Sequence, residues 1–193
     1  MKLIAAVSFP DLRSEKGAEG NGASFCVATE KGLARFVSFI NVLHNLQKIM
    51  AKNEHYLDSC IWLNLFKKEG DPTKGIPYWK LAKNFIEQVE DEKGKIIVST
   101  IILKELYFTL GEKFDGVKGF LKEAGYVNII KTTSDDYDLA REFEQQHGLI
   151  SFYDYLHVAI AKRLGIPLIT RDRDLMDFAK NHVKVFKPED LLS

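Results

Sequence analysis

The sequence is poor in cysteine and has no excess of charge of either sign. It contains two cysteines, Cys26 and Cys60, and neither belongs to a CxxC pair. This argues against a disulfide scaffold and a zinc knuckle, and it fits a reducing cytosol. Lysine plus arginine and aspartate plus glutamate number 27 each, so net charge would not attract nucleic acid. A nucleic-acid partner would therefore need a local basic patch or a bound cation.

Long hydrophobic runs and phosphate-binding loops are also missing. The apolar run at the start ends at Phe9, before Pro10, and is too short for a signal-peptide core or a membrane span. Neither GxxxxGKS/T nor GxGxxG occurs, which removes the usual nucleotide-binding functions. We therefore expect a cytoplasmic protein that does not enter a membrane. With 46% apolar and 28% charged residues, its 193 residues are typical of a globular domain.

Residues 1–53 differ in pattern from the rest and are predicted to form an N-terminal extension. A strand candidate at 3–9 is followed by a glycine-rich, charged loop at 11–24. Apolar residues then recur at helical spacing over 33–50, which predicts a helix that packs on the main domain or on a second copy of the chain. Two alternatives stay open: a partner-binding arm, or a gene-model artefact in which translation really begins at Met50.

Residues 54–193 alternate between short apolar strands and amphipathic helices, which predicts an α/β domain. The order indicates a three-layer α/β/α sandwich around a central, mainly parallel sheet of four to five short strands. The expected strands are 55–58, 95–98, 126–132, 167–170 and 183–186. The expected helices are 59–70, 78–94, 99–113, 114–125, 134–148, 151–165 and 174–182.

Acidic residues follow two of the expected strands at the point where each strand ends. Asp58 closes the first strand, and Asp172 and Asp174 follow the fourth. In an open parallel sheet, active sites lie beyond the carboxyl ends of the strands. Taken singly, Asp58 and Asp172 could equally be helix caps, and Asp174 could be a first-turn acid. Asp177 is expected to be solvated.

Two further acids, Glu105 and Asp154, lie in helices that are apolar nearly all round. We expect Glu105 to have little access to water, because no face of its helix is broadly polar. An unpaired buried carboxylate is costly, and several of them repel one another. A divalent cation would resolve both problems, and ligation by oxygen points to Mg²⁺ or Mn²⁺. The alternatives are an ion pair in the core for Glu105 and a helix-dipole role for Asp154.

The chain from about residue 54 to 193 resembles a PIN domain. The matching stretches are YLDS at 56–59, ILKELY at 102–107, SFYDYLHVAIA at 151–161, LITRDRDL at 168–175 and the closing KPEDLL. Position by position, the resemblance implies an acidic quartet of Asp58, Glu105, Asp154 and Asp172, with Asp174 as a supplementary metal ligand. It also implies supporting hydroxyls at Ser59 and Thr170. Cys60 stands where many toxin-like members have Asn, and the segment 69–94 is long for the minimal toxin form.

This resemblance implies an endoribonuclease that uses Mg²⁺ or Mn²⁺, one ion or two, to hydrolyse RNA phosphodiester bonds. It also implies the toxin of a toxin–antitoxin pair, with an antitoxin partner and a homodimer. Arg171 and Arg173 could contact RNA phosphates, and solvated arginines are the alternative. Tyr153, Tyr155 and Trp62 could stack on bases, although core packing is favoured for Trp62. His157 is expected to support the site or to pack in the core.

A binding module, a phosphatase and a receiver domain are the alternative functions for a sequence of this kind. The rival reading is a non-catalytic PIN-like module that binds nucleic acid or protein. A phosphatase of the DxDx type would need a second Asp at position 60, which is Cys60 here. A receiver domain would need paired acids at the end of its first strand, and Asp58 stands alone there.

Overall fold

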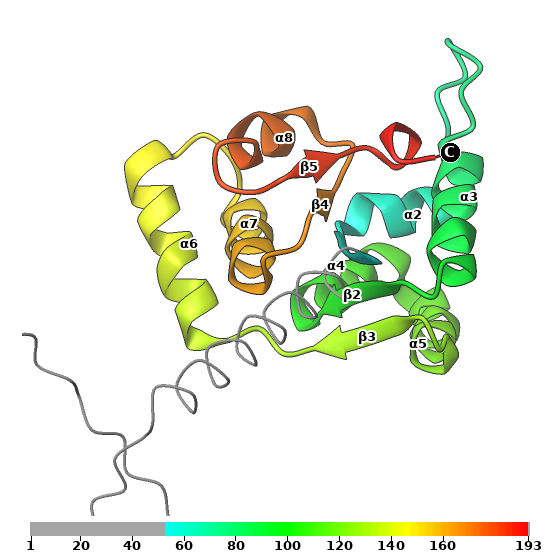
Figure 1. Cartoon of the computed structure of the whole chain (residues 1–193), viewed down its shortest axis with the longest axis horizontal. Coiled ribbons are helices and arrows are strands. Elements are labelled where there is room, and N and C mark those ends of the chain that lie inside the picture. Colours follow the sequence, from blue (N-terminus) through cyan, green and yellow to red (C-terminus); the bar gives the residue numbers. More distant parts are fainter. Residues whose placement is uncertain (1–52, 193) are drawn as a thin grey trace, which may run out of the picture. The chain divides into compact units, whose positions relative to one another are not determined.

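The computed structural model describes residues 53–192 and contains alternating strands and helices throughout (Figure 1). In chain order the elements are β1 (Glu54–Leu57), α2 (Ser59–Lys67), α3 (Tyr78–Asp91), β2 (Lys95–Ser99), α4 (Thr100–Leu110), η2 (Gly111–Lys113), α5 (Phe114–Glu123), β3 (Val127–Ile130), α6 (Ser134–His147), α7 (Phe152–Leu164), β4 (Leu168–Ile169), α8 (Arg173–Ala179), β5 (Val185–Phe186) and η3 (Pro188–Asp190). The extension at 1–52, including the helix expected at 33–50, lies outside the described residues. The domain boundary stays a prediction.

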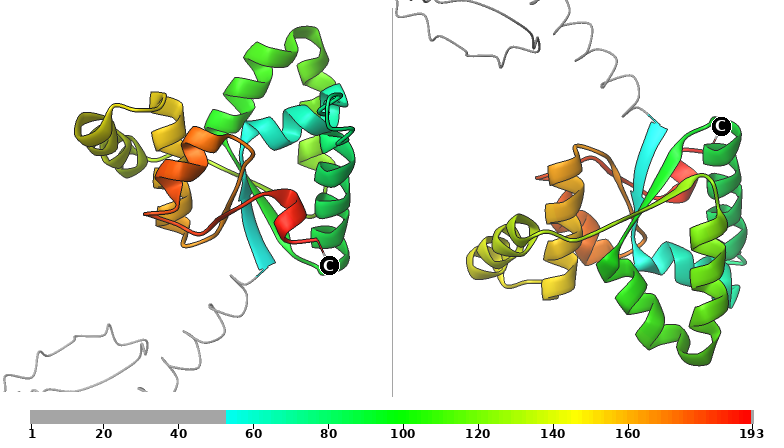
Figure 2. Two further views of the ribbon diagram at one scale, coloured as in Figure 1. Left: turned by 90° about the horizontal axis from the view of Figure 1, so that it is seen from above. Right: turned by 90° about the horizontal axis from the view of Figure 1, so that it is seen from below.

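The five strands form one parallel sheet in the order β3-β2-β1-β4-β5. Helices α2 to α5 lie on one side of the sheet and α6 to α8 on the other (Figure 2). The predicted three-layer α/β/α sandwich with a mainly parallel sheet is thus confirmed. The chain winds outward from β1 in both directions, so the strand order reverses beside β1. This reversal is where open parallel sheets place their ligands.

Apolar side chains from the sheet and from both helical layers fill the core. Tyr56 and Leu57 of β1 are fully buried, as expected for a central strand covered on both faces. Trp62 of α2 is also fully buried, which confirms its predicted core position. None of the helices within 53–192 is both long and apolar enough to cross a membrane.

Helix ends differ from the predicted limits where the backbone leaves helical geometry. Helix α2 ends at Lys67 rather than at residue 70, because Lys68 adopts a left-handed conformation with φ of 55°. Helix α8 begins at Arg173, one residue early, since the Asp172 side chain caps it by accepting from the Leu175 N–H.

An ion pair that the sequence analysis missed joins α6 to α7. The guanidinium of Arg163 donates two hydrogen bonds to Asp136, of 2.6 and 2.9 Å, and the Asp136 side chain also accepts from the Thr133 N–H. Burial alone would raise the pKa of Asp136, but the hydrogen bonds from Arg163 and Thr133 outweigh burial and lower it. Asp136 therefore stabilises the fold in its ionised form.

We expect Asp136→Asn to lower the free energy of unfolding by about 2 kcal/mol, because it leaves the Arg163 charge unpaired. Since the folded-state pKa is lowered, the wild-type advantage is full above the unfolded pKa of about 4 and shrinks as pH falls below it. Urea titrations from pH 7 to pH 3 measure both effects. Asp138→Asn is the matched control, because the Asp138–Arg141 pair in the same helix is exposed. Equal losses in the two variants would contradict the prediction.

Candidate active site

Asp58 is the first residue after β1 and points toward the neighbouring strand rather than back onto its own helix. It occupies the N-cap position of α2, yet its side chain makes no capping hydrogen bond. Its Oδ2 accepts a 2.7 Å hydrogen bond from the Thr170 hydroxyl, and Oδ1 accepts a 3.3 Å bond from Ser59. The side chain is 7% exposed. This geometry counts against a simple capping role for Asp58.

Thr170 links the acid of the first strand to the acid after the fourth. Its fully buried hydroxyl donates to Asp58 and accepts a 3.1 Å hydrogen bond from the Asp172 N–H. The Cys60 thiol lies 3.5 Å from the same hydroxyl. Burial, with the nearby negative charge of Asp58, raises the pKa of Cys60 well above its usual value, so this thiol stays protonated.

Glu105 extends from α4 toward the same region. Its Oε2 lies 3.0 Å from His157 Nε2, and its side chain is 23% exposed. Glu105 is therefore partly exposed, whereas little access to water was expected. The outer face of α4 is apolar in sequence but open to solvent, with Tyr107 and Phe108 being 55% and 72% exposed.

Asp154 combines a capping role with a position at the site. It is the third residue of α7, and its Oδ2 accepts from the Ser151 N–H at 3.1 Å while the Ser151 hydroxyl accepts from the Asp154 N–H. Burial raises the pKa of Asp154, and the charge of Asp58 adds to the effect, while Ser151 and His157 oppose it. The capping box thus fixes the carboxylate without using both of its oxygens.

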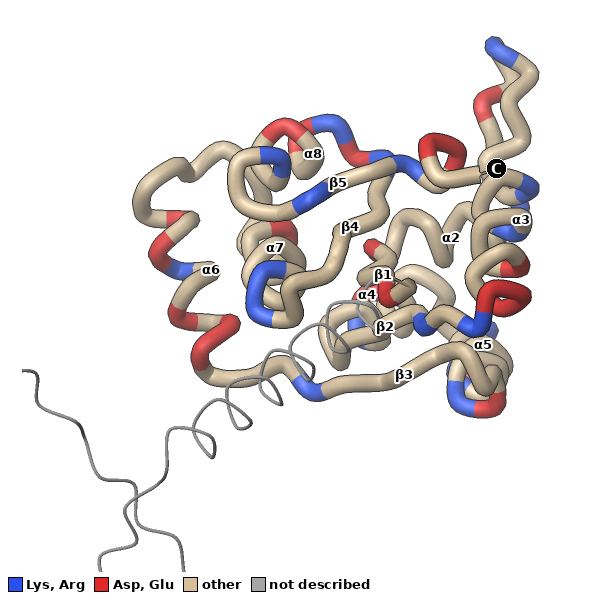
Figure 3. The backbone as a smooth tube through the Cα atoms, viewed as in Figure 1, with Lys and Arg blue, Asp and Glu red and all other residues tan. Residues whose placement is uncertain are grey.

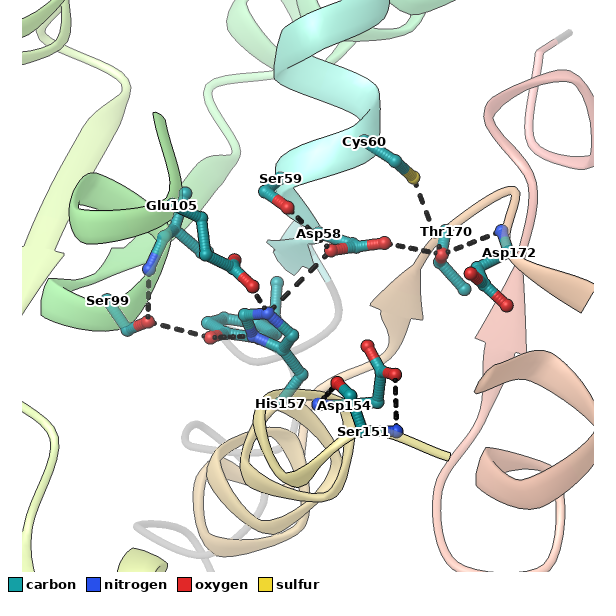
Figure 4. Close-up of polar contacts among 12 residues, drawn as sticks. Asp58, Ser59, Cys60, Ser99, Glu105, Ser151, Asp154, His157, Thr170 and Asp172 are labelled. Atoms are coloured by element: carbon teal, nitrogen blue, oxygen red, sulfur yellow. Dashed lines mark hydrogen bonds and ion pairs between the residues drawn. The ribbon is translucent and has the colours of Figure 1, made fainter. Parts of the chain in front are cut away.

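The four predicted acids come from four separate segments and lie around Asp58. Figure 4 shows Asp58 in the middle, Glu105 on one side, Asp172 on the other and Asp154 below. Figure 3 marks Asp and Glu in red along the backbone, with red segments close to β1, α4, α7 and α8. Asp172 is exposed and caps α8, so its predicted cap role is confirmed; its predicted metal role stays open. Asp174 is exposed in the first turn of α8.

The sequence analysis understated how close His157 lies to the acids. It lies one turn after Asp154 and is fully buried. Its Nε2 faces Glu105 at 3.0 Å and Asp58 Oδ1 at 3.8 Å. Burial alone would lower the pKa of His157, but the carboxylates of Glu105, Asp58 and Asp154 outweigh burial and raise it. The neighbouring carboxylates therefore favour the charged form of His157 over the neutral form.

The other ring nitrogen of His157 belongs to a buried chain of hydrogen bonds. Tyr56 Oη lies 2.9 Å from Nδ1 and 2.8 Å from the Ser99 hydroxyl. When His157 is charged, Nδ1 donates to Tyr56, which in turn donates to Ser99. The ring orientation is therefore set by β1 and by the end of β2. A histidine three residues after an acid, on an apolar helix face, was the available signal in the sequence.

The residues around Asp58 fit a divalent cation. Within residues 53–192, the grouping of side chains close enough to share an ion is Asp58, Glu105 and His157, whose ligand atoms lie within 4.8 Å of one another. Two converging carboxylates suit an ion that prefers oxygen ligands. Asp154 and Asp172 face the same crevice but do not belong to this grouping.

The two predicted RNA-contacting arginines have different surroundings. Arg171 pairs with Glu189 of the closing KPEDLL segment at 2.6 Å and lies 4.3 Å from the centre of the Tyr78 ring. Its side chain is 12% exposed, so a phosphate would have to displace Glu189. Arg173 is exposed at the start of α8. A phosphate contact therefore stays a prediction for both arginines. The surroundings favour such a contact for Arg173 over Arg171.

The sequence matches the family model described as PIN domain over residues 55–181. The chain belongs to the PIN domain family. This match spans β1 to α8 and so includes every acid at the crevice of this PIN domain.

Three solved structures share the fold of this PIN domain. FitAcB from Neisseria gonorrhoeae is 20% identical, with 71% of this chain and 99% of that chain covered and a TM-score of 0.51. VapBC2 from Rickettsia felis, bound to a DNA fragment from their promoter, is 18% identical, with 69% and 98% covered and a TM-score of 0.51. A toxin–antitoxin complex from Klebsiella pneumoniae is 20% identical, with 69% and 97% covered and a TM-score of 0.50. No curated protein matches the chain in sequence.

We expect His157→Gln to destabilise the metal-free PIN domain by about 3 kcal/mol, because the buried Asp58 and the partly buried Glu105 lose the imidazole that lies between them. Chemical denaturation in EDTA at pH 6 measures the loss. His55→Gln is the matched control, since His55 packs edge-on against Phe85 and burial lowers its pKa. That substitution should cost about 1 kcal/mol or less. Similar losses at the two histidines would show that His157 is not the counterion of the acids.

Proposed function

We propose that this PIN domain is a metal-dependent endoribonuclease. The observation that supports it best is the convergence of Asp58 and Glu105 on one buried imidazole, with Asp154 and Asp172 facing the same crevice. Asp58 and Glu105 would hold Mg²⁺ or Mn²⁺, completed by Asp154 and Asp172. A divalent ion bound there would activate water for attack on a phosphodiester and stabilise the leaving oxygen.

The surrounding residues of the chain hold the acids in place and balance their charge. Thr170 and Ser59 donate to opposite oxygens of Asp58, which restricts rotation of its carboxylate. Ser151 fixes Asp154 through the reciprocal cap of α7. His157 offsets the negative charge of Glu105 and Asp58. Arg173, exposed beside Asp172, would attract the negatively charged RNA strand.

The rival function is a non-catalytic binding module. A module that only binds RNA would gain nothing from Asp58 with 7% exposure or from a buried carboxylate–histidine cluster, because acids repel phosphates. Positioned, poorly solvated acids cost stability, and hydrolysis is the function that needs them. The geometry therefore favours catalysis.

Asp154→Asn should reduce cleavage of a mixed RNA pool by roughly 100-fold or more, since the carboxylate is lost while the amide keeps a cap acceptor. Cleavage should stop in EDTA and return with Mn²⁺. Asp177→Asn is the matched control, because Asp177 is an exposed acid paired with Lys180 and should leave cleavage unchanged. Equal cutting by wild type and Asp154→Asn would reject the site.

We further propose that the protein is the toxin of a toxin–antitoxin pair, with a protein antitoxin as its partner. The shared fold with FitAcB, VapBC2 and the Klebsiella toxin–antitoxin complex supports this. Induced expression of the wild-type chain should slow bacterial growth, whereas Asp154→Asn at the same protein level should not. Growth arrest by both forms would separate toxicity from hydrolysis and contradict the proposal.

A further inference from the structure

The short turn between β4 and α8 carries two groups of the site and belongs to neither element. It consists of Thr170, Arg171 and Asp172. The Thr170 hydroxyl donates to Asp58 at 2.7 Å and accepts from the Asp172 N–H at 3.1 Å. A movement of this turn would therefore alter the bond to Asp58 and redirect the carboxylate of Asp172 at the same time.

Backbone contacts hold the inner side of the turn. The Arg171 N–H donates a 3.4 Å hydrogen bond to the Cys60 thiol, which also lies 3.5 Å from the Thr170 hydroxyl (Figure 4). The Thr170 N–H donates a 3.0 Å bond to the Phe186 carbonyl of β5. Bonds to sulfur are weak, so these contacts leave the outer side of the turn to be held by other groups.

The side chain of Arg171 holds that outer side. Nη1 donates a 2.8 Å hydrogen bond to Glu189 Oε1, and Nη2 lies 2.6 Å from Oε2. The guanidinium carbon lies 4.3 Å from the centre of the ring of Tyr78, the first residue of α3. A planar guanidinium that meets a carboxylate with two nitrogens and stacks on an aromatic ring has a defined geometry. The side chain thus ties the turn to η3 and α3.

We propose that Arg171 is a positioning residue that holds Thr170 and Asp172 in the directions that hydrolysis requires. This inference rests on the proposed ribonuclease function and gives Arg171 a role other than contact with RNA. Both terminal nitrogens of its side chain face Glu189, so the residue acts through the turn and not on the substrate. A misplacement of about 1 Å can slow an enzyme by roughly 100-fold, so the turn has a direct influence on kcat.

Glu189→Gln distinguishes positioning from phosphate binding, because the two roles predict opposite results. If Arg171 positions the turn, loss of the charged partner should lower kcat for RNA cleavage about fivefold and leave KM within about twofold of the wild type. If Arg171 binds a phosphate, the substitution frees the guanidinium. KM would then fall while kcat stays unchanged, and this result would overturn the inference.

A double-mutant cycle tests whether the two residues act as a unit. Arg171→Met should lower kcat about tenfold, and adding Glu189→Gln should cause no further loss, because the pair is already broken. Losses that multiply in the double variant would contradict a shared role. Arg141→Met is the matched control, since Arg141 forms an exposed pair with Asp138 on α6 and should leave kcat and KM unchanged.

Amide hydrogen exchange measured by NMR tests the turn without RNA. Glu189→Gln should speed exchange at Arg171 and Asp172 by about tenfold, because the turn opens locally more often. The Tyr56 N–H, which donates to the Pro167 carbonyl within the sheet, should keep its rate. If the pair served only global stability, exchange would rise at Tyr56 as well, the unfolding midpoint would fall, and kcat of the folded protein would not change.

Together these measurements separate failure of this inference from failure of the proposed function. If the wild type cuts RNA but Glu189→Gln retains both kcat and the exchange rates of the turn, the positioning role fails and the ribonuclease stands. If the wild type cuts no RNA, the ribonuclease proposal fails, and the positioning of hydrolytic groups fails with it. Local exchange at Arg171 and Asp172 would then show only whether the side chain holds the turn.

Discussion

The contact of His157 with Asp58 and Glu105 is the interaction on which the rest of this site depends. Asp58 follows β1 and Glu105 lies in α4. In a metal-free protein the negative charges of these two side chains would repel each other. His157 lies between them, and its other nitrogen is held by Tyr56 and Ser99. The acids therefore stay close to one another before any ion binds. A divalent cation would therefore meet carboxylates that are already close together.

The same arrangement explains why α7 is central to the domain. Its first turn supplies Asp154, its second turn supplies His157, and its last turn supplies Arg163 to the ion pair with Asp136 of α6. Seven consecutive residues of α7, from 155 to 161, are buried. A helix that is apolar on every side cannot rotate without exposing core residues. The rigid core thus fixes the direction in which the polar residues of α7 point.

Much of the fold and the position of each acid could be predicted from the sequence. Short apolar strands between amphipathic helices predict a parallel sheet. Asp58 and Asp172 each follow one of these strands, so both are expected at the same edge of the sheet. The role of His157 could not be predicted, because periodicity gives the face of a helix but not what packs against it. The partial exposure of Glu105 was not predicted for a related reason. The outer face of α4 is apolar, but no element within residues 53–192 covers it. The engagement of Arg171 with Glu189 depends on a contact across 18 positions that no local pattern reveals.

The order of the strands also determines when the carboxylate cluster can form during synthesis. Asp58 leaves the ribosome early, while the hydroxyl that orients it belongs to Thr170, which is separated from it by 112 positions. Contacts between such distant positions form late, because closing a long loop costs conformational entropy before any contact compensates for it. A nascent chain that ends before β4 lacks both Thr170 and Asp172. The hydrogen bond from Thr170 to Asp58 therefore forms only after synthesis has passed β4.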